Sequence, residues 1–170
     1  MPERPNDRPL RVVFVCLGNI CRSPMAERVA ERAAADAGVT GVEFSSAGTT
    51  SEEYDDSMDY RAAAVLEKHG YRHADHRARR ITEANLESAD LVVAMEDRHV
   101  SSVLALAMDP AMDPAKVSLL TDFDPAAEPG SGVPDPFFGA DTGFSDTLTA
   151  IEAAMPGLLE RIRELQSTGP

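Results

Sequence analysis

Short apolar runs alternate along the chain with longer stretches in which apolar residues recur at helical spacing. Four short runs are typical of strands, at residues 12–15, 42–45, 91–94 and 117–120, and the first of them is rich in β-branched and aromatic residues. Helical stretches follow the strands, at residues 25–37, 57–69, 97–108 and 143–166. This alternation is typical of a parallel sheet. The sequence therefore predicts an α/β fold, a Rossmann-like doubly wound sheet of four parallel strands flanked by helices.

Proline and glycine residues set the expected boundaries. Ser23 is a good helix cap, Pro24 suits the first helical position, and Gly38 is a natural stop for the first helix. Pro156 lies inside the last helix and is expected to kink or split it. The Pro/Gly-rich stretch 121–142 is long for a structureless connection, and such loops are often functional.

The whole chain is expected to form one domain. Its 170 residues are enough to bury a single core without disulfides or structural metals. Residues 1–9 carry three prolines before any apolar period begins, so we expect a flexible lead-in, a domain over residues 10–166 and a flexible tail over 167–170.

The charge balance excludes several partners. A formal net charge of -13 works against binding to nucleic acid and to anionic membrane surfaces. The longest apolar runs fall far short of the roughly 20 residues that span a bilayer, and no signal-peptide pattern opens the sequence, so we expect a cytoplasmic protein. Cys16 and Cys21 are the only cysteines, which rules out a disulfide framework and a four-thiolate zinc site.

The loop that joins the first strand to the first helix has the composition of an anion-binding site. Such a loop points backbone N–H groups and a helix N-terminus at whatever lies beyond the sheet. Gly18 permits a tight turn, and Arg22 offers a planar fork of donors that matches two phosphate oxygens. These positive groups would stabilise a thiolate on Cys16, and Ser23 could donate a hydrogen bond to it. An isolated cysteine is more often simply buried, but the combination of residues favours a phosphate-binding loop with a nucleophile.

Asp135 is the candidate proton donor for such a site. Expelling an alkoxide or phenolate from phosphate needs an acid on the side opposite the nucleophile. Pro134 and Pro136 stiffen the backbone on either side, and nearby phosphate would favour the protonated carboxyl. Taken alone, the Asp-Pro pair would indicate only a surface turn.

The motif of Cys16, five residues, Arg22 and Ser23 resembles the phosphate loop of the low-molecular-weight protein tyrosine phosphatases. Segments 46–49, 59–61 and 133–137 resemble that family's segment after the second strand, its following helix start and its acid loop. The resemblance implies hydrolysis of phosphotyrosine in protein substrates, with neither metal nor organic cofactor. We expect a monomer or a weak homodimer.

The resemblance also implies a role for each site residue. Cys16 would attack phosphorus to give a phosphocysteine, Arg22 would hold the phosphoryl oxygens, and Asp135 would serve first as acid and then as base. Substrate-binding positions would be Leu17, Gly18, Asn19, Ile20, Cys21, Ser23, Tyr54, Phe137 and Phe138. Positions that support the loop would be Asn19, Ser23, Ser46 and His76. An exposed position for His76 stays open, because its spacing is one residue longer than expected.

Departures from the family pattern concern the choice of substrate. Phe137 and Phe138 stand where many relatives have two tyrosines, so regulation by phosphorylation at those positions is excluded. Glu52 stands where relatives often place an aromatic side chain, and Tyr54 could substitute for it. Because acidic residues 52, 53, 55 and 56 would repel acidic phosphopeptides, a restricted or basic substrate is a hypothesis.

Three other functions compete with phosphotyrosine hydrolysis. Relatives that hydrolyse phosphoarginine commonly carry threonine where this chain has Ile20, which favours phosphotyrosine here. An arsenate reductase on this fold would use two later cysteines, and none follows Cys21, which leaves only the use of an external thiol. A non-catalytic phosphate-binding module would need neither Cys16 nor Asp135.

A reversible disulfide between Cys16 and Cys21 would provide redox regulation, and a purely packing role for Cys21 is the alternative.

Overall fold

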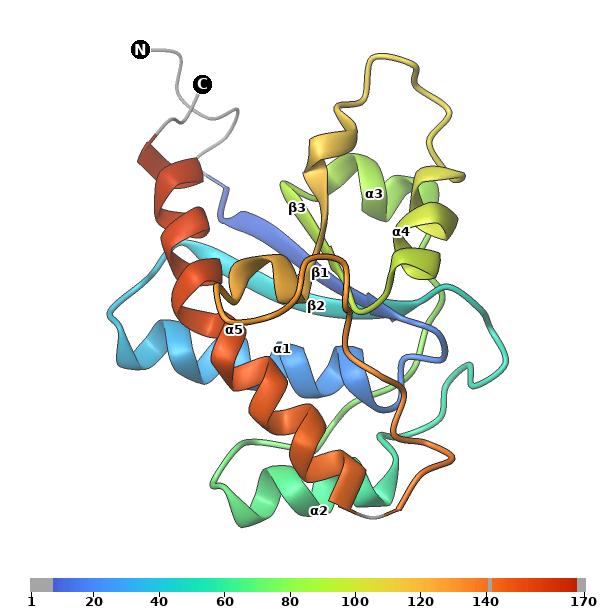
Figure 1. Ribbon diagram of the computed structural model, residues 1–170. Helices are drawn as coiled ribbons and strands as arrows, with labels where there is room; N and C mark the ends of the chain where they lie inside the picture. Colours follow the sequence, from blue (N-terminus) through green and yellow to red (C-terminus); the bar gives the residue numbers. More distant parts are fainter. Residues whose placement is uncertain (1–7, 141, 168–170) are drawn as a thin grey trace.

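A parallel sheet forms the centre of the molecule. The computed structural model describes residues 8–140 and 142–167. The strands are β1 (Leu10–Cys16), β2 (Val42–Gly48), β3 (Leu91–Ala94) and β4 (Val117–Leu119), in the order β2-β1-β3-β4. All three neighbouring pairs are parallel (Figure 1). The predicted α/β fold with four parallel strands is confirmed.

Helices connect the strands and cover the sheet. The α-helices are α1 (Arg22–Asp36), α2 (Tyr60–Lys68), α3 (Glu83–Ser88), α4 (Asp97–Leu104) and α5 (Thr142–Ser167). Two short 3₁₀ turns, η1 (Pro114–Lys116) and η2 (Leu120–Phe123), flank β4.

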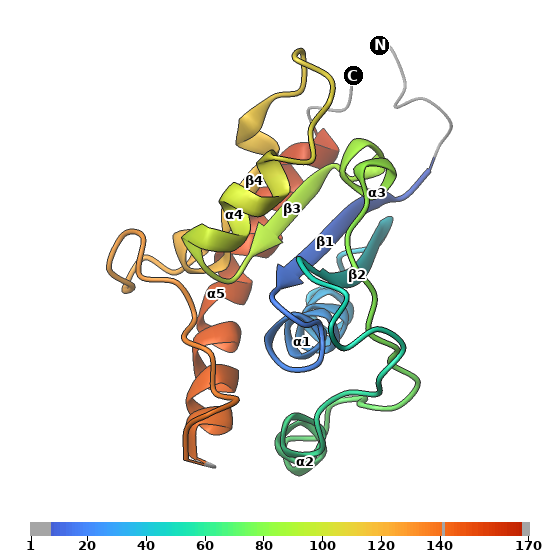
Figure 2. The same cartoon turned by 90° about the vertical axis from the view of Figure 1, so that its right-hand side faces the viewer.

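Alternate side chains of β1 enter two separate cores, as the pleat of a strand requires. Val12 and Phe14 pack with α1, α2 and α5 in the larger core, whereas Val13 and Val15 pack with residues of α3 and α4 in the smaller one. Figure 2 shows α1 and α4 on opposite sides of the sheet. This doubly wound arrangement buries β1 on both faces and leaves its carboxyl end free to carry a loop.

Several element boundaries differ from those predicted. Helix α1 begins at Arg22, so Ser23 lies inside its first turn, and its hydroxyl bonds Cys16 and Asn19 instead of capping the helix. Helix α2 begins three residues later than predicted, at Tyr60, and α4 ends at Leu104.

The last helix is not split at Pro156. Helix α5 runs unbroken over 26 residues, because one lost N–H is outweighed by the row of apolar side chains that the helix buries against the larger core. Gly157 is required beside the proline, since a Cβ there would overlap the carbonyl oxygen of Phe123. The helix therefore packs its backbone directly against η2.

Both ends of the described chain are tied to the sheet region. Arg8 donates two hydrogen bonds to the carboxylate of Asp90, at 2.8 and 3.1 Å, and Gln166 donates to the carbonyl of Thr40 at 2.7 Å. The predicted flexibility of residues 1–7 and 168–170 lies outside the described residues. Within residues 8–140 and 142–167, no helix is long and apolar enough to cross a membrane.

Candidate active site

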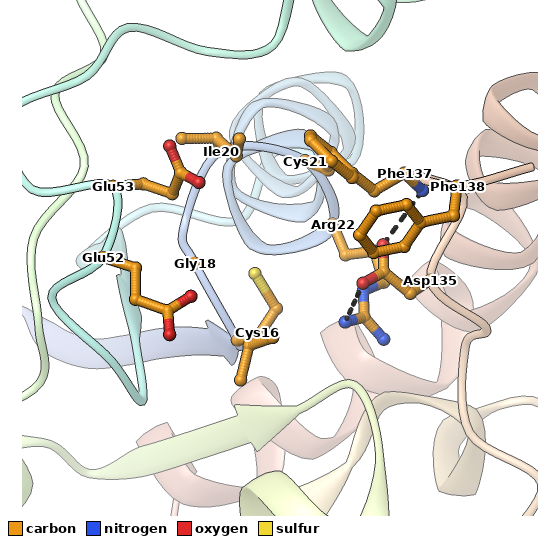
Figure 3. A pocket seen from close by; sticks show the side chains of 11 residues that line it. Cys16, Gly18, Ile20, Cys21, Arg22, Glu52, Glu53, Asp135, Phe137 and Phe138 are labelled. Atoms are coloured by element: carbon orange, nitrogen blue, oxygen red, sulfur yellow. Dashed lines mark hydrogen bonds and ion pairs between the residues drawn. The ribbon is translucent and has the colours of Figure 1, made fainter.

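A pocket opens at the carboxyl end of β1, where three loops meet. One loop follows β1, the second follows β2 and the third precedes α5 (Figure 3). The pocket is lined by Cys16, Leu17, Gly18, Ile20, Cys21, Arg22, Glu52, Glu53, Asp135, Phe137 and Phe138. In Figure 3 the two glutamates lie on one side of Cys16, and Asp135 with the two phenylalanines lies on the other.

The loop after β1 is shaped by a close approach to the end of β2. A Cβ at Gly48 would lie 2.7 Å from the carbonyl oxygen of Leu17 and 3.2 Å from the nitrogen of Asn19, so only glycine fits there. Thr49 N–H donates to the carbonyl of Cys16 at 2.9 Å. Asn19 has a φ of 61°, a left-handed conformation that costs energy and needs support from its surroundings.

Side-chain hydrogen bonds behind the loop supply that support. The Asn19 amide donates to the hydroxyls of Ser23 at 2.9 Å and Ser46 at 3.0 Å. Cys16 Sγ lies 3.0 Å from Ser23 Oγ. The Ser23 oxygen accepts from Asn19, and its proton can be donated to the sulfur or to the Ala47 carbonyl, which lies 3.4 Å away. The Cys16 sulfur thus has a hydroxyl within hydrogen-bonding distance behind the loop.

His76 completes the support from the opposite side. Its Nε2 lies 2.6 Å from the carbonyl oxygen of Asn19, and since a carbonyl can only accept, this nitrogen donates. Burial lowers the pKa of His76, which keeps the ring neutral. The Ser46 hydroxyl in turn donates to Glu27 at 2.8 Å. His76 is thus buried within the network rather than exposed.

Arg22 lies almost fully buried beneath the pocket, with 2% of its side chain exposed. It donates hydrogen bonds to the Glu96 carboxylate and, at 2.9 Å, to the carbonyl of Val133. Its other terminal nitrogen pairs with Asp135 at 3.5 Å. Burial alone would raise the pKa of Glu96, but hydrogen bonds from Arg22 and Arg98 outweigh it and lower that pKa. The guanidinium is therefore held in place by an ionised carboxylate.

The third loop is pinned to the end of β3. Val133 N–H donates to the carbonyl of Met95 at 2.7 Å, and Gly132, with a φ of 70°, permits this close approach. Asp135 accepts a hydrogen bond from the N–H of Phe137 at 3.0 Å, which fixes one carboxylate oxygen (Figure 3). The other oxygen faces Arg22.

Most residues that the sequence analysis assigns to substrate binding line this pocket, and three do not. The side chains of Asn19 and Ser23 are buried behind the loop, where they hold it. Tyr54 is 69% exposed and lies outside the lining. Glu52 and Glu53 occupy that side of the mouth instead. The pocket therefore has an acidic edge, and Tyr54 does not provide an aromatic one.

Sequence reasoning missed Glu96, which is 74 residues from its partner Arg22. The signal was nonetheless present, because Glu96 follows almost directly after β3, and the carboxyl ends of parallel strands meet at one edge of the sheet. A charged residue at that edge, one strand away from a buried arginine, is a natural partner for it.

The second cysteine is poorly suited to act as a nucleophile. Burial is the main factor that raises the pKa of the Cys21 thiol, and the neighbouring Asp59 raises it further. Both thiols are free and buried in the structure. In the part of the chain that the structure describes, no three His, Cys, Asp or Glu side chains gather closely enough to hold a metal ion. The pocket brings together the Cys16 thiol, the Arg22 guanidinium and the Asp135 carboxyl.

Comparisons with known proteins agree on one family. A family model described as low molecular weight phosphotyrosine protein phosphatase matches residues 11–168. A protein of Streptomyces coelicolor named low molecular weight protein-tyrosine-phosphatase is 46% identical over 156 residues, which cover 91% of this chain and 94% of that protein.

Solved structures show the same fold. A protein tyrosine phosphatase of Entamoeba histolytica, crystallised with Hepes in its active site, superposes with a TM-score of 0.85 at 29% identity and covers 92% of this chain and 99% of its own. An arginine phosphatase of Drosophila superposes with a TM-score of 0.81 at 25% identity, covering 89% of this chain and 97% of its own.

Proposed function

Because this chain belongs to the family of low molecular weight phosphotyrosine protein phosphatases, we propose that it hydrolyses phosphotyrosine in proteins through a phosphocysteine formed on Cys16. The observation that carries the proposal is the convergence of Cys16, Arg22 and Asp135 on one pocket, although the first and last are 119 positions apart in the chain. The cavity volume of about 110 Å³ is well below that of pockets for free small-molecule ligands. It suits the end of one phosphorylated side chain.

The first step transfers the phosphoryl group to sulfur. The Cys16 thiolate attacks phosphorus in line with the leaving oxygen, so a sulfur–phosphorus bond forms as the phosphorus–oxygen bond to tyrosine breaks. Arg22 and the amides of residues 17–22 stabilise the charge on the three equatorial oxygens. Asp135 gives its proton to the departing phenolate oxygen.

The charge of the substrate prepares Asp135 for that step. Its carboxylate pairs with Arg22 at 3.5 Å. A bound phosphate dianion competes for the same guanidinium and places negative charge beside the carboxyl, which favours its protonated form. After the phenol leaves, the carboxylate takes a proton from water, the resulting hydroxide attacks phosphorus, and the sulfur–phosphorus bond breaks to release phosphate.

Phe137 and Phe138 provide an apolar wall for an aromatic ring at the mouth of the pocket. Phe137 is partly buried, and Phe138 is 92% exposed, in edge-to-face contact with its neighbour at 4.8 Å between ring centroids. Stacking a tyrosine ring on this wall removes exposed apolar area from water, whereas the guanidino stem of phosphoarginine offers less. This favours phosphotyrosine over phosphoarginine. An arsenate reductase using an external thiol is the remaining alternative.

The opposite edge of the mouth favours basic segments beside the phosphotyrosine. Glu52 and Glu53 line it, and the Glu53 stem packs against Gly18, where an added Cβ would lie 3.1 Å from it. The Glu53 side chain therefore lies against the phosphate loop. A lysine or arginine that flanks the phosphotyrosine would offset this negative charge.

The experiment compares phosphotyrosine and phosphoarginine peptides of identical flanking sequence, and arsenate with a small thiol. We expect wild type to cleave the phosphotyrosine peptide with the higher kcat/KM, Cys16→Ser to be inactive, and Asp135→Asn to lose about 100-fold or more. Faster cleavage of phosphoarginine would overturn the substrate assignment. Activity in Cys16→Ser would overturn the mechanism.

A further inference from the structure

Arg61 connects two of the loops that form the pocket, yet it does not line the pocket itself. It is the second residue of α2, and it binds Asp59, the N-cap residue of that helix. Its Nε donates to one carboxylate oxygen at 3.2 Å and its Nη2 to the other at 3.1 Å, while its backbone N–H donates at 2.8 Å. Burial would raise the pKa of Asp59, but the hydrogen bonds from Arg61 outweigh it and lower that pKa. Arg61 and Asp59 therefore form a bidentate ion pair.

The same guanidinium holds the loop that carries Asp135. Its Nη1 donates to the carbonyl of Phe137 at 3.0 Å. The guanidinium carbon lies 5.2 Å from the centre of the Phe137 ring and 4.6 Å from that of Phe144, both within cation–π range. Phe144 is fully buried at the start of α5. Arg61 therefore lies between the helix α2, the acid loop and the start of α5.

Phe137 connects Arg61 to the carboxyl group of Asp135 by hydrogen bonds. Its carbonyl accepts from Arg61, and its N–H donates to Asp135 Oδ1 at 3.0 Å. At the other end, the Asp59 N–H donates to the carbonyl of Ile20 in the phosphate loop at 2.9 Å. A continuous set of hydrogen bonds thus runs from the phosphate loop through Asp59, Arg61 and Phe137 to Asp135.

We infer that Arg61 is a positioning residue for the proton donor: it sets the distance between the Asp135 carboxyl and the phosphate loop by clamping Phe137 to Asp59. This role rests on the proposed phosphatase function. Only arginine offers enough donors in one plane to bind both carboxylate oxygens of Asp59 and the carbonyl of Phe137 at once, with a flat face left for the two rings. A lysine has the charge but not the fork.

The test is the dependence of kcat/KM on the leaving group, which a merely structural role would not change. A nitrophenolate departs readily without a proton, whereas an unsubstituted phenolate needs one. General acid catalysis is worth at least about 100-fold, so a displaced acid that forfeits half of that free energy slows phenyl phosphate about tenfold. We expect Arg61→Met to lose about tenfold on phenyl phosphate and less than about threefold on nitrophenyl phosphate.

Arg32 offers a matched control. Its guanidinium lies 5.1 Å from the centre of the Tyr71 ring, donates to the Gly70 carbonyl at 3.1 Å and pairs with Asp36 at 3.5 Å, outside the pocket lining. Arg32→Met removes the same kinds of contact, and we expect the leaving-group ratio of this variant to equal that of wild type. If Arg61→Met does not fold, Arg61→Lys provides the same measurement, with a smaller shift in the same direction.

A double-mutant cycle shows whether Arg61 acts through Asp135. Once Asp135→Asn has removed the proton donor, adding Arg61→Met should change the leaving-group ratio by less than about twofold, because the two changes affect one interaction. Equal losses on both substrates in Arg61→Met, or a further change in ratio in the double variant, would overturn the positioning role while the phosphatase function stands. A wild type that cleaves neither substrate would overturn both.

Discussion

Replacing Gly48 by alanine tests whether the end of β2 shapes the phosphate loop. The added Cβ would lie 2.7 Å from the Leu17 carbonyl oxygen, 3.1 Å from the Gly18 carbonyl carbon and 3.2 Å from the Asn19 nitrogen, all of them backbone atoms. Gly48 cannot retreat, because its N–H and carbonyl are both hydrogen-bonded to residues 79 and 81 on its other side. The loop has to move instead.

The size of that movement follows from the contact distances. The Leu17 oxygen has to withdraw by at least 0.3 Å to reach the 3.0 Å limit of observed contacts, and by 0.7 Å to reach an ordinary contact of 3.4 Å. Overpacking of this kind typically costs about 1–3 kcal/mol. At about 2–4 °C per kcal/mol for a domain of this size, the Tm should fall by roughly 2–12 °C. A misplacement approaching 1 Å can cost on the order of 100-fold in rate.

The assay measures Tm and kcat/KM for an aryl phosphate in Gly48→Ala and in Gly38→Ala. Gly38 has a φ of 69° and no atom within 4 Å of an added Cβ, so its replacement strains the backbone far from the loop. We expect both variants to lose stability, but only Gly48→Ala to lose kcat/KM, by about tenfold or more. Wild-type kcat/KM in Gly48→Ala would refute the argument that this close approach fixes the loop.

Three further predictions concern charge, pH and oxidation. Neutralising the pocket edge in Glu53→Gln should reduce the preference for basic over acidic phosphotyrosine peptides by about threefold, the order of one exposed charge pair in water, while Glu160→Gln on the exposed face of α5 should not change it; an unchanged preference in Glu53→Gln would contradict the acidic edge. Burial lowers the pKa of His99 to about 4 from 6.5, so the folded state resists protonation, and stability should fall by up to about 3 kcal/mol as pH drops through that window. Thermal melts should show a weaker pH dependence in His99→Gln, and equal slopes would contradict this. If Cys21 protects Cys16 by forming a disulfide, wild type should recover activity after peroxide and thiol treatment better than Cys21→Ser, and equal recovery would contradict protection.

The sheet could be predicted from sequence because β1 and β3 are buried runs rich in β-branched residues, and the other two runs alternate with helical stretches. Strand β3 matches its predicted bounds, Leu91–Ala94, and β1 and β2 contain theirs. Helix α3 was missed because its six residues are too few to show a period, and its start depends on a local exchange of hydrogen bonds between Thr82 and Asn85. The unbroken path of α5 through Pro156 depends on packing against η2, which no local pattern records.

The residues of the candidate site also differ in whether the sequence alone identifies them. Cys16, Arg22 and Ser23 share one loop, so their spacing alone indicates that they act together. A contact between distant segments, such as that of Arg61 with Phe137, becomes visible only once the fold brings the loops together. Local spacing therefore identifies the chemistry, and the tertiary fold identifies the residues that hold it in place.

Trapping the covalent intermediate tests the central claim most directly. Wild type is mixed with an aryl phosphate, quenched in acid during turnover, and digested for mass spectrometry, with Cys16→Ser as the control. The proposed mechanism predicts phosphate on the peptide that contains Cys16, and none on the corresponding peptide of Cys16→Ser. Turnover without phosphate on that peptide, or phosphate on a different residue, would contradict the assignment of Cys16 as the nucleophile.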